Sequence, residues 1–77
     1  PLRLIAPITE WKDHFKASIW HVRIEPDAKN GLSKTSSIDA LQLRGVDTAR
    51  FTRKLGSLPS TLMEELVAAI AAVVEYQ

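Results

Sequence analysis

The chain contains no cysteine, and its 77 residues include only two histidines and three glycines. Without cysteine there can be neither a disulfide framework nor a thiolate metal site. The histidines, His14 and His21, form no H-x-x-x-H pair, so the spacing of a helical metal site is also missing. A core of this size is usually marginal without disulfides, a metal or another subunit. We therefore predict no metal and no cofactor, and we expect a stabilising protein partner.

The glycines are scattered, so the phosphate-binding patterns G-x-x-x-x-G-K and G-x-G-x-x-G do not occur, and neither does the G-x-S-x-G elbow of serine hydrolases. Long hydrophobic runs are missing as well. The most apolar stretch, residues 66–74, is about half of the roughly 20 residues that a membrane-spanning helix needs. No segment resembles a signal peptide. These absences exclude classical nucleotide-binding and hydrolase folds, and they predict a cytoplasmic protein without a membrane partner.

Neither sign of charge is in excess: ten Lys and Arg residues stand against nine Asp and Glu residues, which gives a net charge of +1. The distribution along the chain is nevertheless uneven. Residues 44–54 contain four cations and one acid, whereas residues 57–77 contain three acids and no cation. A basic strip beside an acidic helix is compatible with phosphate contact on one side of the molecule, and it is also compatible with two solvated faces.

Apolar periodicity predicts strands and loops over the first part of the chain. Residues 2–8 form a predicted strand that is buried on both faces, and residues 19–24 alternate as a second strand does. Between them, residues 10–18 fit a short surface helix or an irregular loop. Residues 25–34 are rich in turn formers and predict a loop, and residues 35–44 predict a third strand.

The end of the chain predicts one long helix. Pro59 precedes Ser60, a residue type typical of N-caps, and apolar residues then recur on one face at helical spacing: Leu62, Leu66, Ile70 and Val73. The opposite face carries few charges. We therefore expect the helix to be covered on more than one side, by its own sheet and by another chain.

The stretch from Gln42 to Leu58 carries a family resemblance. It contains Q-L-R-G-x-D, then R-F, then K-L-G-S-L, which is similar to the Q-I-R-T-x-D, R-L and K-x-G-S-L series of the MazF/PemK toxins. Three earlier segments are similar to that family too: L-I-A-P-I-T at 4–9, H-V-R-I at 21–24 and G-L-S-K-T-S at 31–36. The chain thus resembles a MazF/PemK toxin that lacks the N-terminal third.

The resemblance implies an α+β, mainly β fold: a small, curved, SH3-like barrel of the MazF/CcdB type with a C-terminal helix. Residues 1–77 would be a single domain holding the last two thirds of such a toxin, with the first strands lying before Pro1. The resemblance also implies a strand from Phe51 to Leu58. Local rules instead allow a short helix capped by Asp47, but we prefer the strand because a two-turn helix is marginal and tertiary pairing overrides it.

By resemblance the chain is a toxin of a type II toxin–antitoxin system, a metal-independent endoribonuclease that cleaves single-stranded mRNA at short sequence motifs. Such cleavage requires a base for the ribose hydroxyl, a cation for the phosphorane and an acid for the leaving oxygen. The implied partners are single-stranded RNA, a cognate antitoxin and a second copy of the chain in a homodimer.

The resemblance carries four functional positions over to this chain. Thr9 and Arg44 are the candidate catalytic residues, and Gln42 and Asp47 are the candidate RNA-binding residues. A further catalytic Arg, from the loop after the family's first strand, would lie before the start of this chain. Gly45 stands where the family usually has Thr, so the groove in which the resemblance places the RNA lacks one hydroxyl.

Each assignment has a structural alternative. Thr9 could terminate a strand, Gln42 could be a buried amide that ties strands together, and Asp47 could be a cap. The aromatic residues could stack bases or belong to the core: Trp11, Phe15 and Trp20. The competing function is a non-enzymatic binding module, either a CcdB-like gyrase poison or a degenerate remnant that dimerises or sequesters antitoxin.

Overall fold

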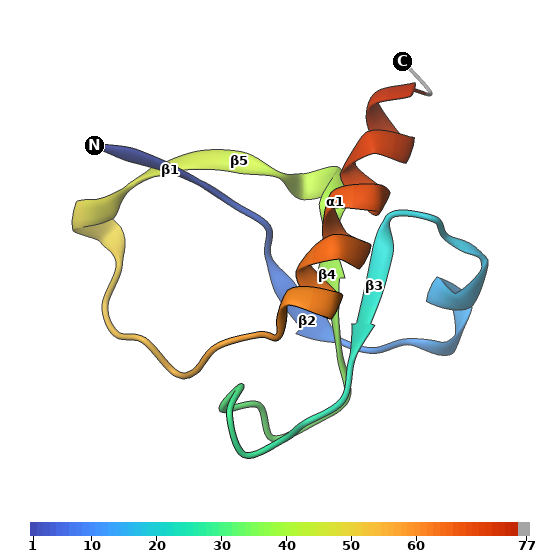
Figure 1. Ribbon diagram of the computed structural model, residues 1–77, viewed down its shortest axis with the longest axis horizontal. Coiled ribbons are helices and arrows are strands. Elements are labelled where there is room, and N and C mark those ends of the chain that lie inside the picture. The colour runs from blue at the N-terminus through green and yellow to red at the C-terminus, as the bar shows by residue number, and fades with distance from the viewer. Residues whose placement is uncertain (76–77) are drawn as a thin grey trace.

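The computed structural model describes residues 1–75 of the chain. These residues form two small antiparallel sheets, three short 3-10 helices and one long α-helix (Figure 1). The elements are, in chain order, β1 (Leu2–Ile5), β2 (Ile8–Glu10), η1 (Asp13–Ala17), β3 (His21–Ile24), β4 (Ser36–Asp39), η2 (Ala40–Gln42), β5 (Arg44–Asp47), η3 (Thr48–Arg50) and α1 (Ser60–Glu75). One sheet pairs β1 with β5, and the other has the order β2-β4-β3. The predicted α+β, mainly β class is confirmed; within the described residues the strands do not close into a barrel.

The hydrophobic core lies between the three-stranded sheet and α1. The strand register places Ile8, Ile38 and Val22 side by side, so their side chains share one face of the sheet. α1 packs over this part of the molecule and contacts β3 and η2 (Figure 1). Ile38 is only 2% exposed, and burying such a side chain fully stabilises the fold by about 1.5–3 kcal/mol. The other buried apolar residues are Val22, Ile24, Ala40 and Ala69.

The predicted C-terminal helix is confirmed, and its start differs by one residue from the prediction. The backbone N–H groups of Leu62 and Met63 both donate to the carbonyl oxygen of Pro59 at 3.1 Å. Because the Pro59 carbonyl already accepts these bonds, Ser60 is the first helical residue and not the N-cap. Leu62, Leu66 and Ile70 pack against the core as predicted. None of the helices in residues 1–75 combines the length and apolarity that crossing a membrane requires.

The first strand is shorter and more exposed than the sequence suggested. Pro7 has no N–H to donate to a ladder, although its carbonyl accepts a hydrogen bond of 3.0 Å from the N–H of Asp39. Neither Ala6 nor Pro7 belongs to a strand, so β1 ends at Ile5 and β2 begins at Ile8. Leu2 and Leu4 of β1 are 69% and 73% exposed, because no second layer in the described part of the chain covers the ribbon that β1 forms with β5. The prediction of one strand over residues 2–8, buried on both faces, was therefore wrong.

The predicted strand over residues 35–44 is also interrupted. β4 ends at Asp39, whose Oδ1 accepts a hydrogen bond of 3.0 Å from the backbone N–H of Leu41. This local bond starts the 3-10 turn η2, which carries the chain out of the three-stranded sheet and into the ribbon at Arg44. The predicted strand is thus divided between two sheets by one hydrogen bond, from the backbone N–H of Leu41 to the side chain of Asp39.

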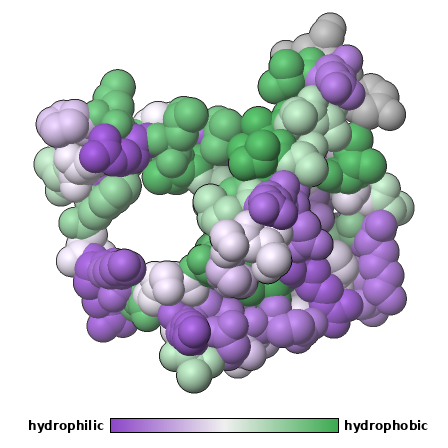
Figure 2. Space-filling view, viewed as in Figure 1, coloured by the Kyte–Doolittle hydropathy of each residue, from purple (hydrophilic) through white to green (hydrophobic). Residues whose placement is uncertain are grey.

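Residues 51–59 contain neither helix nor strand, so the strand predicted from Phe51 to Leu58 was wrong. This connection runs in a wide arc from the ribbon to α1 (Figure 1), and Figure 2 shows an opening between it, the ribbon and the body of the molecule. Its backbone meets another segment where Ser57 N–H donates to the Lys29 carbonyl at 2.8 Å. Lys29 belongs to a loop with turn geometry and not to a strand edge, so no ladder can propagate from this contact.

The loop over residues 25–34 is confirmed, and a buried amide holds it together. Asn30 is 6% exposed. Its Nδ2 donates to the Glu25 carbonyl at 2.9 Å, and its Oδ1 accepts from the backbone N–H groups of Leu32 at 3.0 Å and Asp27 at 3.2 Å. The side chain therefore replaces backbone pairing that the loop cannot make.

Replacing this amide tests the loop's contribution to stability. We expect Asn30→Ala to lower the free energy of unfolding by about 1–3 kcal/mol, because it leaves buried backbone groups without partners. Urea unfolding of the variant beside Lys29→Ala, a change in an exposed side chain of the same loop, measures the effect. Equal midpoints for the two variants would contradict this account of the loop.

Candidate functional site

Thr9 lies inside β2, directly opposite Ser37 of β4. Its side chain is exposed, and Glu10 continues the strand after it, so Thr9 does not terminate the strand. Cross-strand partners share a face, which places Thr9, Ser37 and Arg23 of β3 on the face opposite the hydrophobic core. The threonine hydroxyl is thus presented from an edge strand, each residue of which pairs with β4.

Arg44 begins β5, directly opposite Ile5 of β1. Its side chain is exposed and makes no hydrogen bond or ion pair with another described residue. Thr9 is the fourth residue after Ile5, so at most about 14 Å of extended chain joins the two. The link through Ala6 and Pro7 therefore joins the two sheets and brings the two candidate catalytic residues into one neighbourhood.

Gln42 and Asp47 lie on either side of Arg44 along the chain. Gln42 ends η2 and is exposed, so the alternative of a buried amide was wrong. Asp47 ends β5, and its Oδ1 accepts a hydrogen bond of 2.9 Å from the N–H of Ala49. Asp47 is therefore a cap of η3, as the structural alternative proposed, while its side chain stays exposed. RNA contact by Gln42 and Asp47 remains a prediction.

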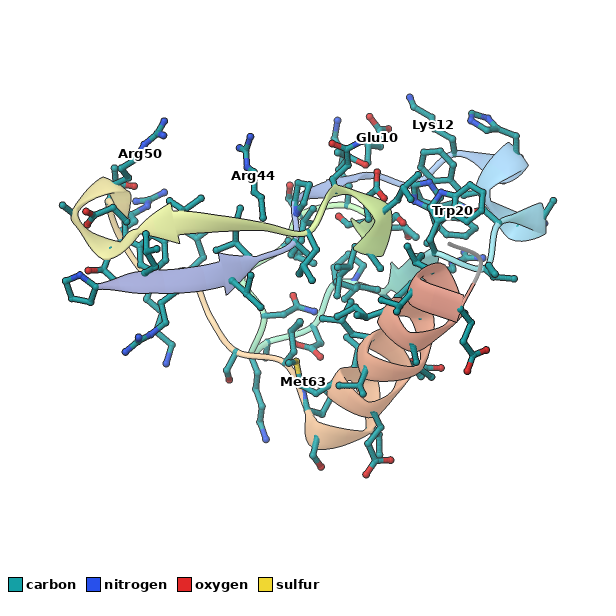
Figure 3. All side chains as sticks on the ribbon, turned by 90° about the horizontal axis from the view of Figure 1, so that it is seen from above. Glu10, Lys12, Trp20, Arg44, Arg50 and Met63 are labelled. Atoms are coloured by element: carbon teal, nitrogen blue, oxygen red, sulfur yellow. The ribbon has the colours of Figure 1, made fainter. Side chains whose placement is uncertain are left out.

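Cations gather on the side of the molecule where Arg44 projects. Figure 3 shows Arg50, Arg44 and Lys12 directed to one side, with Glu10 between them. Glu10 forms an ion pair of 3.9 Å with Lys34, and both side chains are more than half exposed, so this pair contributes at most about 1 kcal/mol. The face is weakly basic, and no group of three His, Asp or Glu side chains in the described residues is arranged to hold a metal ion.

The aromatic residues near Thr9 pack against one another. The ring of Phe15 stacks on His21 with 3.8 Å between centroids and 4° between planes, and Trp11 meets Phe15 edge-on at 5.7 Å. All three rings are half-buried. Their geometry supports the core alternative for Trp11 and Phe15: they dock η1 onto the sheet and form a second, smaller core on the same face of the sheet as Thr9.

Sequence reasoning missed the hydrogen bond between His21 and Ser37, which lies beside Thr9 on the same face of the sheet. Nδ1 of His21 and Oγ of Ser37 are 2.9 Å apart, and Ser37 is completely buried opposite Thr9. The alternation in residues 21–24 placed His21 on the outer face, but nothing in the sequence specified that Ser37 would lie beside it. Strand register depends on tertiary contacts that periodicity alone does not encode.

A second set of polar side-chain contacts lies along the edge of the sheet face that carries Thr9. The Arg23 guanidinium lies 5.2 Å from the centre of the Trp11 ring, and its Nε donates to Glu25 Oε1 at 2.8 Å. The Thr35 hydroxyl donates to Glu25 Oε2, also at 2.8 Å. The hydrogen bond from Thr35 is the main cause that holds the pKa of Glu25 below its ordinary value; desolvation opposes it, and the nearby Arg23 lowers the pKa further.

Comparison with known proteins decides the family. The model of a family described as PemK-like, MazF-like toxin of type II toxin-antitoxin system matches residues 1–74. This chain belongs to that family. No curated protein matches it.

Solved structures support the MazF-type fold. The Mycobacterium tuberculosis toxin MazF-mt6 superposes with a TM-score of 0.79 and 22% identity over 96% of this chain and 70% of that one. A crystal structure of an Mtb toxin superposes with a TM-score of 0.76 and 24% identity, over 94% of this chain and 74% of that one. At these identities the likeness shows the fold, and it confirms the sheets and C-terminal helix expected from the MazF/PemK resemblance.

The pKa of Glu25 predicts how stability depends on pH. Because the pKa is lowered in the folded state, the ionised carboxyl stabilises the fold above its ordinary pKa of 4.5, and this stabilisation is lost as the pH falls through the lower folded value. The difference in unfolding free energy between the native chain and Glu25→Gln should therefore be constant above about pH 6 and shrink in acid.

NMR titration of the Glu25 carboxyl checks the cause directly. Thr35→Val keeps the shape of the side chain and removes the hydroxyl, so it should raise the pKa of Glu25 toward the ordinary value. An unchanged titration curve in Thr35→Val would show that this hydrogen bond does not control the carboxyl.

Proposed function

We propose that this MazF-like toxin is a metal-independent endoribonuclease that cleaves single-stranded mRNA in the cytoplasm at a short sequence motif. The observation that carries the proposal is the pairing of β1 with β5, which sets Arg44 opposite Ile5 and so beside the segment that leads to Thr9. Both side chains are exposed, so a ligand that spans the link between Ile5 and Thr9 can reach the guanidinium and the hydroxyl.

Arg44 is suited to the scissile phosphate. Its planar guanidinium can donate two parallel hydrogen bonds to phosphate oxygens, and no acidic side chain among the described residues competes for it. As the ribose 2′-hydroxyl attacks phosphorus, negative charge grows on the non-bridging oxygens, and a guanidinium held there stabilises the transition state more than the ground state. The hydroxyl of Thr9 would donate a hydrogen bond to the same phosphate and help to orient the phosphate.

Gln42 and Asp47 extend this site along β5. Phosphate contacts position a nucleic acid, whereas polar side chains at the base edges read its sequence. The amide of Gln42 can donate and accept, and the second carboxylate oxygen of Asp47 is available to accept from a base amine while the first caps η3. Gln42 lies two residues before Arg44, whereas Asp47 ends β5 on the face opposite Arg44, so the RNA would meet Gln42 beside the phosphate and reach Asp47 only at the end of β5.

Exposed apolar side chains on α1, and around the opening between the ribbon and residues 51–59, support the proposal that the chain binds other proteins. Met63, Val67 and Val74 are exposed on one flank of α1, which we call the outer helix strip. Met63 points toward the ribbon (Figure 3) and lines a cavity of about 430 Å³ with Ile8 and Leu55. Exposed apolar groups gathered this way are typical of interaction surfaces. We infer that a second copy of the chain, in a homodimer, and a cognate antitoxin cover them.

The same apolar surface favours the competing function. Leu2, Leu4 and Phe51 are exposed together with the outer helix strip, so protein binding alone could account for this surface without any chemistry. Under this alternative the chain is a CcdB-like or degenerate module that binds protein. Under the leading proposal, residues 1–77 are the last two thirds of the toxin, and a further arginine comes from chain that precedes them.

Substitution of the two candidate catalytic residues tests the enzyme. In the protein encoded by the complete reading frame, Thr9→Ala and Arg44→Ala should each reduce cleavage of a long single-stranded RNA in EDTA by at least about 100-fold. Because both side chains are exposed, the free energy of unfolding should change by no more than about 0.5 kcal/mol. Lys16→Ala, an exposed cation on η1, is the matched control and should cleave normally.

The outcomes separate the two functions. Specific cuts by the native protein that both variants lose, at unchanged stability, support catalysis by Thr9 and Arg44. A large loss of stability in either variant would make that residue structural. No cuts by the native protein would favour the binding module.

The interface is tested on the outer helix strip. Val67 is 62% exposed, so Val67→Glu should leave the fold of the monomer intact while it weakens self-association and antitoxin binding by about tenfold or more. Sedimentation and antitoxin titration measure both, with Thr61→Glu, an exposed position outside the strip, as the control. Unchanged association of Val67→Glu would remove the strip from the interface.

A further inference from the structure

Residues 12–19, which we call the flap, are fixed by backbone hydrogen bonds only at their two ends. Before the flap, the N–H of Trp11 donates to the Thr35 carbonyl at 2.9 Å, and after it the N–H of Ala40 donates to the Trp20 carbonyl at 2.8 Å. Between these anchors the backbone bonds stay inside the flap, and its side chains form no hydrogen bond or ion pair with another described residue. The flap contains η1, none of whose residues is buried.

The ring of Phe15 holds the flap against the sheet. It stacks on His21 with 3.8 Å between centroids, and Trp11 meets its edge. Ser37, whose Oγ lies 2.9 Å from Nδ1 of His21, is completely buried although it faces away from the hydrophobic core. Undocking of Phe15 would therefore uncover His21, and open the way to Ser37, on the sheet face that carries Thr9.

Buried polar atoms oppose the docked state. Nε1 of Trp11 and Oγ of Ser18 are both buried, and neither has a hydrogen-bond partner among the described residues. A buried polar group without a partner loses its hydration and gains nothing in return. Water reaches Ser18 when the flap lifts, so undocking restores the hydration of this hydroxyl. The ring packing at Phe15 has to outweigh this penalty for the flap to stay docked.

The flap stands where an RNA strand bound at the candidate site would continue. Figure 3 shows Arg44 and Lys12 directed to the same side of the molecule with Glu10 between them, and Lys12 is the first residue of the flap. Thr9 lies three residues before the flap, on the sheet face that the flap covers. A phosphate shared by Arg44 and Thr9 has a nucleotide on either side, and the nucleotide directed away from Arg44 meets the docked flap.

We propose that the flap is a gate: it undocks from His21 to let single-stranded RNA pass over Ser37 beside Thr9, and its docked state limits RNA binding. This inference rests on the proposed ribonuclease function. The structure shows the docked state, and the apparent affinity for RNA is reduced by the fraction of molecules in which the flap is open. Substitutions that change this fraction should change RNA affinity in the same direction without altering Thr9 or Arg44.

Two substitutions should move the gate in opposite directions in the protein encoded by the complete reading frame. Ser18→Ala removes the unpartnered hydroxyl and favours docking, so it should lower kcat/KM on a long single-stranded RNA roughly three- to tenfold, mainly through KM. Phe15→Ala removes the ring stack and should raise kcat/KM by a similar factor. Ser33→Ala, at an exposed serine outside the flap, is the matched control. A flap with a purely structural role would give no such gain in Phe15→Ala.

Modification of histidine by diethyl pyrocarbonate reports the state of the flap without RNA. His21 is stacked under Phe15, whereas His14 is exposed and serves as the reference in the same molecule. The rate at His21 relative to His14 should fall in Ser18→Ala and rise in Phe15→Ala. Because Phe15→Ala also bares the imidazole directly, Ser18→Ala is the decisive variant. Urea unfolding of each variant verifies that the rest of the fold persists.

The outcomes separate failure of the gate from failure of the proposed function. Native cleavage with an unchanged kcat/KM in Ser18→Ala, or with losses in both variants, would overturn the gate and leave the ribonuclease standing. An unchanged relative rate at His21 in Ser18→Ala would overturn the gate as well. If the native protein binds a random-sequence single-stranded RNA without cutting it, the same order of affinities among the variants supports the gate and removes the enzyme. A native protein that neither binds nor cuts RNA would overturn both proposals.

Discussion

Strand β4 is the constraint on which the described structure depends. It is paired on both sides, with β2 along one edge and β3 along the other, and both of its faces are covered. Ile38 points into the core against α1, and Ser37 points the other way into the bond with His21. A one-residue shift of β4 would exchange the isoleucine and the serine between an apolar and a polar environment, so the register is strongly specified. That register sets Thr9 in place, and the η2 turn that follows β4 sets the start of β5 at Arg44.

The features that the sequence predicted well are those that periodicity encodes locally. The C-terminal helix, the alternating strand at His21–Ile24 and the loop after it follow from spacing and turn composition within a few residues. The errors arose where one residue or one distant contact decides the outcome. Asp39 ended a strand by bonding its own backbone, and the segment after Phe51 found no strand edge to pair with. Neither event changes the hydrophobic pattern of the sequence, so that pattern could predict neither of them.

The candidate site was found by a different route. Thr9 and Arg44 came from family resemblance, and the structure adds the physical link between them, which is the pairing of β1 with β5. The hydrogen bond between His21 and Ser37 could not be predicted, because it depends on which residues face each other across strands. Asp47 was open to two interpretations in the sequence, and the bond to Ala49 shows that capping is one of its tasks.

Stability and the proposed function lie in different parts of this toxin. The three-stranded sheet and α1 contain the buried side chains, whereas the ribbon of β1 and β5 is exposed on both strands and carries Arg44, Gly45 and Asp47. A ribbon with so few buried contacts adds little to the free energy of folding, and it gains order from whatever binds it, because a ligand that binds only the folded form stabilises that form. Because Arg44 and Asp47 are exposed, we expect substitutions of these ribbon residues to change binding with little effect on folding.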